Sequence, residues 1–344
     1  MKPLRIASIV VLMCVSTVGS QSLHAYESAS SRTAPLAHVG LEDIAARGGA
    51  DLWFTESTRH RIGRITSSGT ITEFPVPRPL VRPFHIIYGP DNKMWFTEAD
   101  STRIGYLRLG DFAEGEVTIK VARSQPAVIA NGPDARLWFT DAGANKIGRM
   151  RSNGTLVEYA LPTANSGPLG ITHGLTNSVW FTEATANKIG RINLTVDSSA
   201  VLTTMEGKPA EFPLPTAHGR PEDICSGPYD DMWFTDALGD HIGRITRAGR
   251  ITLFPLPPGS HPRRITGDYT DNVWFTEPGT NKIGRLSGKG QLTEFRLPTL
   301  GSVPQGIAVG AYGIIWFTEQ GSDKIGRITP TGKLTEFSVL PAPR

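Results

Sequence analysis

The chain is a succession of short runs in which apolar and polar residues alternate, and no stretch carries the period of an amphipathic helix. Glycine, proline, asparagine and aspartate separate the runs, as they do at the turns between strands. Four such runs recur in every block of about 42 residues. The pattern therefore predicts an all-β protein built from repeated four-stranded units.

All seven tryptophans stand in the same tripeptide, Trp-Phe-Thr, and they mark the repeats. Nine residues after each tryptophan comes Ile-Gly, and five repeats then carry a run such as Ile71-Thr-Glu-Phe74. A Pro-x-x-Ile step, such as Pro304-Gln-Gly-Ile307, opens repeats two to seven. The tryptophans are Trp53, Trp95, Trp138, Trp180, Trp233, Trp274 and Trp316, with spacings of 42, 43, 42, 53, 41 and 42 residues.

Four strands in about 42 residues is the length of one blade of a β-propeller, so the repeats predict seven blades with four antiparallel strands each. A two-sheet sandwich fits less well, because identical units cannot fill its inequivalent positions. The longer spacing before Trp233 falls in residues 193–209 and predicts a long hairpin tip in blade four. We expect a single propeller domain over residues 38–344, in which the sequence leaves the manner of ring closure open.

The N-terminus has the pattern of a secretory signal over residues 1–25. Lys2 and Arg5 form a positive segment, residues 6–18 supply a short apolar core, and the small-residue cleavage site ends at Ala25. We expect cleavage near Ala25, an N-terminal segment over residues 26–37, and a mature protein that is secreted or periplasmic. No other apolar run reaches the ~18 residues that a membrane span needs.

The charge balance argues against a nucleic-acid partner. The chain has 35 basic and 32 acidic residues and a net charge of +3, and removal of the two cations of the signal leaves about +1, far from the basic footprint of a nucleic-acid binder. We expect a monomer that binds a small molecule or a ligand of the cell envelope.

The two residues inside each Pro-x-x-Ile step should lie at the mouth of the central channel, because the innermost strands line the axis. They differ between blades, with one apolar arc and one charged arc, which is the usual composition of a small-molecule site. The candidate ligand-binding residues are His85, Glu222, Asp223, Arg263, Arg264 and Gln305. As an alternative, Arg263 and Arg264 simply neutralise Glu222 and Asp223 on the neighbouring blade. The seven pairs are Glu42-Asp43, Phe84-His85, Ala127-Val128, Leu169-Gly170, Glu222-Asp223, Arg263-Arg264 and Gln305-Gly306.

A second ring pairs an acid three residues after each tryptophan with a base eight residues after it, as in Glu319 and Lys324. Acid and base flank a four-residue turn and so face each other across a hairpin. Since all seven blades carry the pair, we expect exposed ion pairs that fix the turn, each contributing ~0–1 kcal/mol. A metal-ligand role for Glu319 is the alternative. The sequence has no His-Glu-x-x-His, Gly-x-Ser-x-Gly, P-loop or Cys-x-x-Cys motif.

The repeated unit resembles the virginiamycin B lyase (streptogramin B lyase) family over residues ~38–341. The unit reads Trp-Phe-Thr-Glu, five residues ending in Lys or Arg, Ile-Gly-Arg-Ile, and then Ile-Thr-Glu-Phe. The resemblance implies seven blades and a Mg²⁺-dependent elimination that opens a cyclic depsipeptide at its ester bond. Such a reaction needs a base for the proton beside the carbonyl and a cation for the developing negative charge.

The residues that carry this chemistry in the family are changed here. The resemblance places histidines directly after the proline of the last two Pro-x-x-Ile steps, where this chain has Arg263 and Gln305. The metal-holding glutamate expected before the last of these prolines is Val303, so only Glu319 is retained. Gln305 cannot accept a proton near neutral pH, and Arg263 would repel Mg²⁺.

These substitutions favour an exported binding protein, for which the sequence indicates no certain cofactor. The alternative is a Mg²⁺-dependent streptogramin B carbon–oxygen lyase that uses displaced residues, His85 or Glu319. A lactonase-like hydrolase is a third hypothesis, but the chain lacks the set of Asp, Asn and Glu residues that usually binds the metal in such enzymes.

Overall fold

The computed structural model describes residues 38–48, 51–151, 153–175, 177–196, 202–205 and 208–340. The expected signal peptide (1–25) and N-terminal segment (26–37) lie outside these residues. Over the part of the chain that is described, no helix is both long enough and apolar enough to span a membrane.

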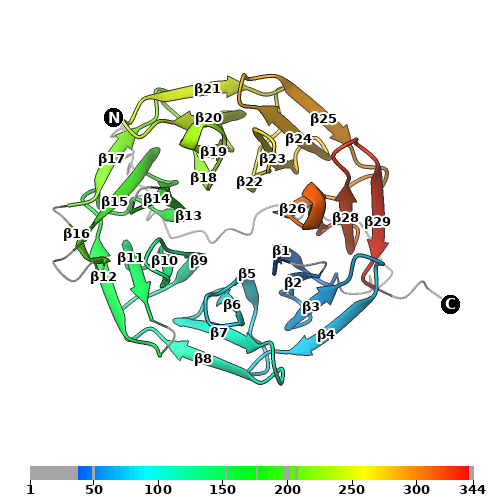
Figure 1. The fold of residues 1–344 in the computed structure, drawn as a ribbon, viewed down its shortest axis with the longest axis horizontal. Helices are drawn as coiled ribbons and strands as arrows, with labels where there is room; N and C mark the ends of the chain where they lie inside the picture. The colour runs from blue at the N-terminus through cyan, green and yellow to red at the C-terminus, as the bar shows by residue number, and fades with distance from the viewer. Residues whose placement is uncertain are drawn as a thin grey trace, which may run out of the picture. The chain divides into compact units, whose positions relative to one another are not determined.

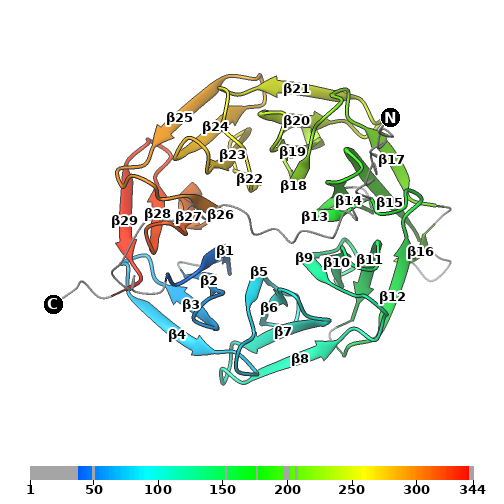
Figure 2. The same ribbon diagram turned by 180° about the vertical axis from the view of Figure 1, so that it is seen from behind.

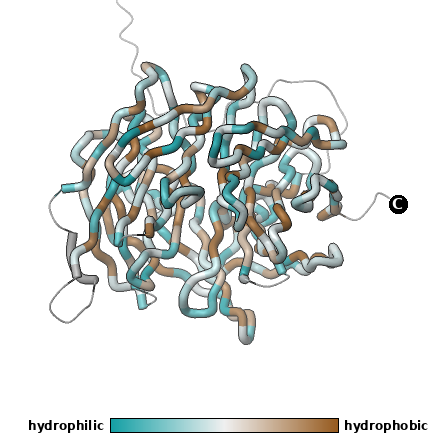
Figure 3. The backbone as a smooth tube through the Cα atoms, turned by 45° about the horizontal axis from the view of Figure 1, so that its top comes forward, coloured by the Kyte–Doolittle hydropathy of each residue, from teal (hydrophilic) through white to brown (hydrophobic). Residues whose placement is uncertain are grey.

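Seven antiparallel sheets follow one another around a common axis, which confirms the predicted seven-bladed β-propeller (Figures 1 and 2). The first strand of each blade is innermost and the last lies at the rim. Apolar and polar segments alternate along the strands (Figure 3), as the sequence pattern requires. We call the face that carries the loops into the first strands and the turns between second and third strands the upper face, and the opposite one the lower face.

The blades are made of consecutive strands. Blade one contains β1 (Leu41–Ala46), β2 (Leu52–Glu56), β3 (Arg61–Ile65) and β4 (Ile71–Pro75); blade two contains β5 (Pro83–Tyr88), β6 (Lys93–Glu98), β7 (Arg103–Arg108) and β8 (Glu114–Thr118); blade three contains β9 (Pro126–Asn131), β10 (Leu137–Asp141), β11 (Lys146–Met150) and β12 (Leu156–Ala160); blade four contains β13 (Pro168–Gly174), β14 (Ser178–Glu183), β15 (Lys188–Val196), β16 (Leu202–Met205) and β17 (Ala210–Pro213). Blade five contains β18 (Pro221–Ser226), β19 (Met232–Asp236), β20 (His241–Ile245) and β21 (Ile251–Pro255); blade six contains β22 (Ile265–Gly267), β23 (Asn272–Glu277), β24 (Lys282–Ser287) and β25 (Leu292–Arg296); blade seven contains β26 (Pro304–Val309), β27 (Ile315–Glu319), β28 (Lys324–Ile328) and β29 (Leu334–Ser338). Two short 3-10 helices, η1 (Pro228–Asp230) and η2 (Ala311–Gly313), stand in lower-face turns of blades five and seven.

Blade four carries the predicted hairpin tip. Strand β15 pairs with the outer strand β17 over Lys188–Arg191, and its continuation pairs with β16. Residues 197–201 and 206–207 of this insertion lie outside the described residues.

The Trp-Phe-Thr strand builds the interfaces between blades. Each of seven hydrophobic clusters joins two neighbouring blades, and the tryptophan of one blade packs with the phenylalanine of the next. In blade seven the ring of Phe317 covers Gly326, where an added Cβ would lie 2.1 Å from the ring. The Ile-Gly motif therefore makes room for the phenylalanine of the adjacent strand.

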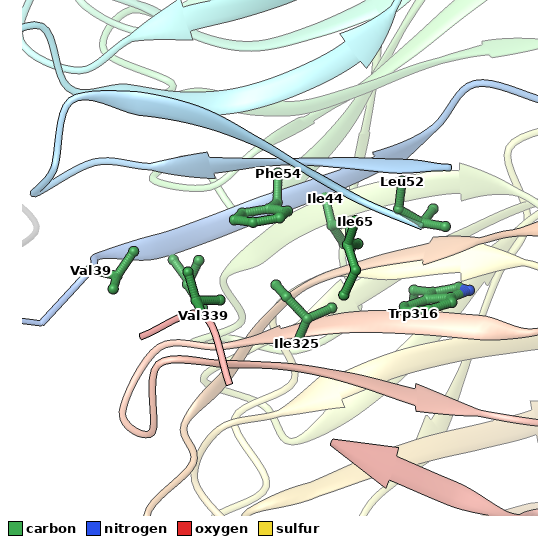
Figure 4. Packing of buried hydrophobic residues seen from close by; sticks show 9 residues of the cluster. Val39, Ile44, Leu52, Phe54, Ile65, Trp316, Ile325 and Val339 are labelled. Carbon is green, nitrogen blue, oxygen red and sulfur yellow. The ribbon is translucent and has the colours of Figure 1, made fainter. Parts of the chain in front are cut away.

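The ring closes by packing between blade seven and blade one, because each sheet consists of consecutive strands. Val39, Ile44 and Phe54 of the first blade share a cluster with Trp316 and Ile325 of the last (Figure 4). The backbone N–H of Val39 also donates to Asp323 Oδ1 at 2.8 Å.

The threonine of each Trp-Phe-Thr joins its blade to the next through one buried hydroxyl. Thr140 Oγ1 accepts a hydrogen bond from the N–H of Val128 on its own inner strand (3.1 Å) and donates to the carbonyl of Leu169 in the following blade (2.7 Å). The same two bonds occur at Thr55, Thr97, Thr182, Thr235, Thr276 and Thr318.

We predict that Thr140→Val lowers the free energy of unfolding by about 1–3 kcal/mol, because it leaves a buried N–H and a carbonyl without their partner. Denaturant titration measures the change. Thr140→Ser, which keeps the hydroxyl, should retain most of the stability, and Thr72→Val on the exposed rim should change it by less than ~0.5 kcal/mol. Equal stability of Thr140→Val and the wild type would contradict this role.

Candidate functional site at the upper end of the propeller axis

The residues inside the Pro-x-x-Ile steps form a bulge on the inner strand. In six blades the pairing register shifts there, as between Pro83 and Ile86. Two residues thus stand opposite one threonine, an arrangement that re-aims side chains at the edge of a sheet. We call the seven residue pairs the axial site.

Four side chains of the axial site form a buried polar cluster, the axial cluster, consisting of Asp43, His85, Asp223 and Arg264. All four are at most 14% exposed. Asp43 Oδ2 accepts the N–H of Ile86 in the next blade at 3.0 Å, and Asp223 Oδ2 accepts the corresponding N–H of Ile265 at 3.0 Å. These carboxylates therefore connect neighbouring inner strands by hydrogen bonds.

Arg264 supplies the positive charge of the axial cluster. Its Nη1 lies 3.7 Å from Asp223 Oδ1 on the neighbouring blade, and its Cζ lies 5.6 Å from the centre of the Phe84 ring. Phe84 belongs to β5, which Figure 1 places across the axis from β22. Burial raises the pKa of Asp43 and of Asp223, and the Arg264 guanidinium opposes both shifts.

His85 is held in a neutral form within this cluster. Burial, aided by Arg264, lowers the pKa of His85 to about 3. Its Nδ1 lies 3.5 Å from the backbone N–H of Ile129 and accepts from it, which places the ring proton on Nε2, 3.4 Å from Asp43 Oδ2. Both ring nitrogens of His85 therefore contact other groups of the propeller.

A second group of polar side chains surrounds Glu42. Arg263 Nη2 lies 3.7 Å from Glu42 Oε2, and Gln320 Nε2 donates to Glu42 Oε1 at 3.0 Å. Gln305 Nε2 donates to Gln320 Oε1 at 3.3 Å, whereas Gln305 Oε1 is buried without a hydrogen-bond partner among the described residues. We call Glu42, Arg263, Gln305 and Gln320 the Glu42 network.

The alternative of neighbouring-blade neutralisation therefore holds for one pair only. Arg264 pairs with Asp223, but Arg263 contacts Glu42, which lies two blades further on. Glu222 Oε1 lies 3.4 Å from Arg220 Nε of its own blade. The opposite arc is apolar, with Phe84, Ala127 and Leu169 each half-buried.

Sequence reasoning named neither Glu42 nor Gln320 as a site residue. Glu42 occupies the pair position in blade one, which lacks the proline that marks the step elsewhere. Gln320 follows the acid of Trp-Phe-Thr-Glu, where the other blades have Ser, Ala or Pro. The large polar side chain of Gln320 at this position was the sequence signal that could have marked it as a site residue.

The acid-and-base ring is built differently from the exposed pairs that the sequence predicts. The residues do face each other, as Glu319 faces Lys324. In six blades the base, however, pairs with an outer-strand glutamate, as Lys324 Nζ does with Glu336 Oε2 at 2.7 Å. In blade five, His241 Nδ1 instead lies 3.7 Å from Asp236 Oδ2. The expectation was wrong because the acids lie beneath the turn: Glu56, Glu98, Asp141, Glu183, Asp236, Glu277 and Glu319 are all at most 1% exposed.

Glu319 does not fit a magnesium site. Its carboxyl is fully buried, Oε2 accepts from Ser322 Oγ at 2.9 Å, and burial raises its pKa, with the Ser302 hydroxyl opposing the shift. No group of three or more His, Cys, Asp or Glu side chains in the described ranges is arranged to hold a metal ion. A cation such as Mg²⁺ takes several oxygen ligands, often with water, around an exposed carboxylate.

The comparisons with known proteins agree with the repeat pattern. The model of the Virginiamycin B lyase family matches residues 16–200 and 200–343. The chain belongs to this family. A virginiamycin B lyase of Nocardia farcinica (strain IFM 10152) is 29% identical over 218 residues, and the match spans 63% of this chain but only 56% of that protein.

Two solved structures of the family superpose closely. A streptogramin B lyase has 34% identity and a TM-score of 0.78, over 88% of this chain and 95% of that one. A catalytically inactive histidine-to-alanine variant of virginiamycin B lyase from Staphylococcus aureus, solved with quinupristin, has 37% identity and a TM-score of 0.69, over 76% and 85% of the two chains.

We predict that Arg264→Leu lowers the free energy of unfolding by about 3–5 kcal/mol, because it leaves Asp43 and Asp223 buried without their cation. Adding Asp223→Asn should recover part of this loss in a double-mutant cycle measured by denaturant unfolding. Arg263→Leu, at a half-buried position, is the control and should cost about 1 kcal/mol or less. Strict additivity of Arg264→Leu and Asp223→Asn would show that the two charges do not interact.

We also predict that stability falls as the pH rises from about 4.5 to 8. Burial, with a contribution from Glu73, raises the pKa of Glu56 from 4.5 to about 8, so the folded state binds more protons than the unfolded state between these values. The resulting slope reaches up to ~1.4 kcal/mol per pH unit for one group. Glu56→Gln should flatten the measured slope, and Glu158→Gln should not. A slope that Glu56→Gln leaves unchanged would refute this assignment.

Proposed function

We propose that this chain is an exported member of the virginiamycin B lyase family that binds a small amphipathic molecule, free or presented by the cell envelope, at the axial site. It acts as a monomer and without elimination chemistry. The Glu42 network carries the proposal, because it offers a partly exposed guanidinium and a buried amide oxygen without a partner among the described residues, beside an apolar arc. Convergent polar groups next to an apolar wall are the usual make-up of a ligand site.

A lyase mechanism that used displaced residues would need His85 or Glu319, and both side chains are already held by contacts within the fold. His85 is neutral, buried and hydrogen-bonded to Ile129, and a base must reach the substrate proton to act. Glu319 is held under its turn by Ser322. We propose that Arg263 and Gln305, at the positions where the resemblance implies histidines, orient a ligand instead of moving a proton.

The axial site suits a ligand with an anionic or carbonyl group and an apolar body. Arg263 retains 30% side-chain exposure and can donate to a carboxylate or a carbonyl, while Phe84, Ala127 and Leu169 offer apolar contact. The segment from Lys2 to Ala25 supports export.

A Mg²⁺-dependent streptogramin B lyase is the second candidate. Membership of the family and 34–37% identity to two lyase structures favour it. It would require a base and metal ligands other than His85 and Glu319, and the Glu42 network supplies only one carboxylate.

The binding proposal is tested by thermal shift with quinupristin and a panel of N-acyl amino acids as amphipathic carboxylates. We predict that at least one compound raises Tm, and that Arg263→Glu weakens its binding at least tenfold in calorimetry. Arg296→Glu, at the exposed end of β25, makes the same charge change and should leave the affinity within twofold. The proposal fails if Arg263→Glu leaves every binding compound unaffected.

A further inference from the structure

A second site lies on the lower face, at the seam between blades four and five. A groove of about 460 Å³ is lined there by Arg191 and Asn193 of β15, Trp180 of β14 and Arg247 of the turn after β20. Its volume lies within the range of small-molecule pockets. The groove is on the face opposite the axial site.

Two arginines line this groove, Arg191 and Arg247. Arg191 Nη1 donates to the backbone carbonyl of Arg247 at 2.5 Å, and its Cζ lies 5.0 Å from the Trp180 ring and 5.4 Å from the Phe212 ring. Burial, followed by the Arg247 charge, lowers the pKa of Arg191. Neither arginine forms an ion pair with an acid among the described residues; Asp230, which shares an adjoining pocket with Arg247, pairs with neither.

Like Arg191, the equivalent residues Arg64, Arg285 and Arg327 form no ion pair with an acid among the described residues. The equivalents of Arg191 in blades three and five have acidic partners: Arg149 lies 2.6 Å from Asp134, and Arg244 lies 3.6 Å from Asp231. The corresponding turn of blade four, residues 174–177, reads Gly-Leu-Thr-Asn and contains no acid.

The turn position of Arg247 is uncharged at comparable seams. Arg327 of blade seven donates to the carbonyl of Ser67 in blade one, which is the same contact with a serine in place of Arg247. Blades six and seven have Gly288 and Pro330 at this position. The blade four–five seam is therefore distinguished by the added cation of Arg247, which the backbone contact does not need.

We propose that this groove binds a small molecule through an oxyanion, with a phosphate monoester gripped by Arg191 and Arg247. Two guanidiniums match the double charge of a phosphate and offer paired N–H donors to its oxygens. Asn193 and Ser178 line the groove beside them as further polar groups. The ring of Trp180 holds the Arg191 guanidinium in place, which lowers the entropy lost when the anion binds.

Calorimetric titration of the mature protein with phenyl phosphate, at constant ionic strength, tests this site. We expect saturable binding, no binding of phenol, and at least a tenfold loss of affinity in Arg247→Ser, which installs the residue found at the blade seven–one seam. Arg191→Tyr should give a similar loss because it removes the other cation, and the fold accepts a tyrosine here, since Tyr106 packs against Trp95 at this position in blade two.

Arg250→Ser is the matched control, since it removes an exposed cation three residues from Arg247, and it should leave the affinity within twofold. Arg263→Glu should also leave it unchanged, so the outcome does not depend on the function of the axial site. The proposal is overturned if phenyl phosphate does not bind, or if Arg247→Ser and Arg250→Ser weaken binding equally.

Discussion

The fold depends on one buried hydroxyl repeated seven times. Each Trp-Phe-Thr threonine accepts an N–H from its own inner strand and donates to a carbonyl of the next, so that every blade is fixed to its neighbour at the upper end of the axis. Because both bonds use backbone groups of the Pro-x-x-Ile bulge, they place no demand on the bulge side chains. At Asp43, His85 and Asp223, bulge side chains add hydrogen bonds of their own between neighbouring inner strands.

Because the threonine bonds use only the backbone of the bulge, side chains there can differ between blades while the architecture is kept. Arg263 and Gln305 occupy bulge positions whose carbonyls accept the threonine hydroxyls, and any side chain leaves those bonds intact. The same reasoning applies at the lower face, where Arg191 makes with the carbonyl of Arg247 the contact that Arg327 makes with the carbonyl of Ser67. The side chains available for ligand recognition in this propeller are thus the few by which the blades differ.

Much of the fold could be predicted because its signal is repeated. Seven tryptophans indicate the blade count, and the Pro-x-x-Ile step alone indicates which residues lie at the axial site. The pairing within that site was less accessible, because the long side chain of Arg263 reaches blade one instead of the neighbouring acid, which no local pattern encodes. The burial of Glu319 and its equivalents was missed because an acid beside a turn has the same sequence pattern whether it points outward or beneath the turn.

The central claim, that the axial site binds without eliminating, is tested most directly by incubating the mature protein with quinupristin in the presence and absence of Mg²⁺. Chromatography with mass spectrometric fragmentation then separates the cyclic compound from the linear isomer of equal mass that ester elimination produces. An authentic virginiamycin B lyase serves as the positive control. If the axial site binds without eliminating, the compound stays cyclic under both conditions; a Mg²⁺-dependent linear isomer would show that the protein is a lyase.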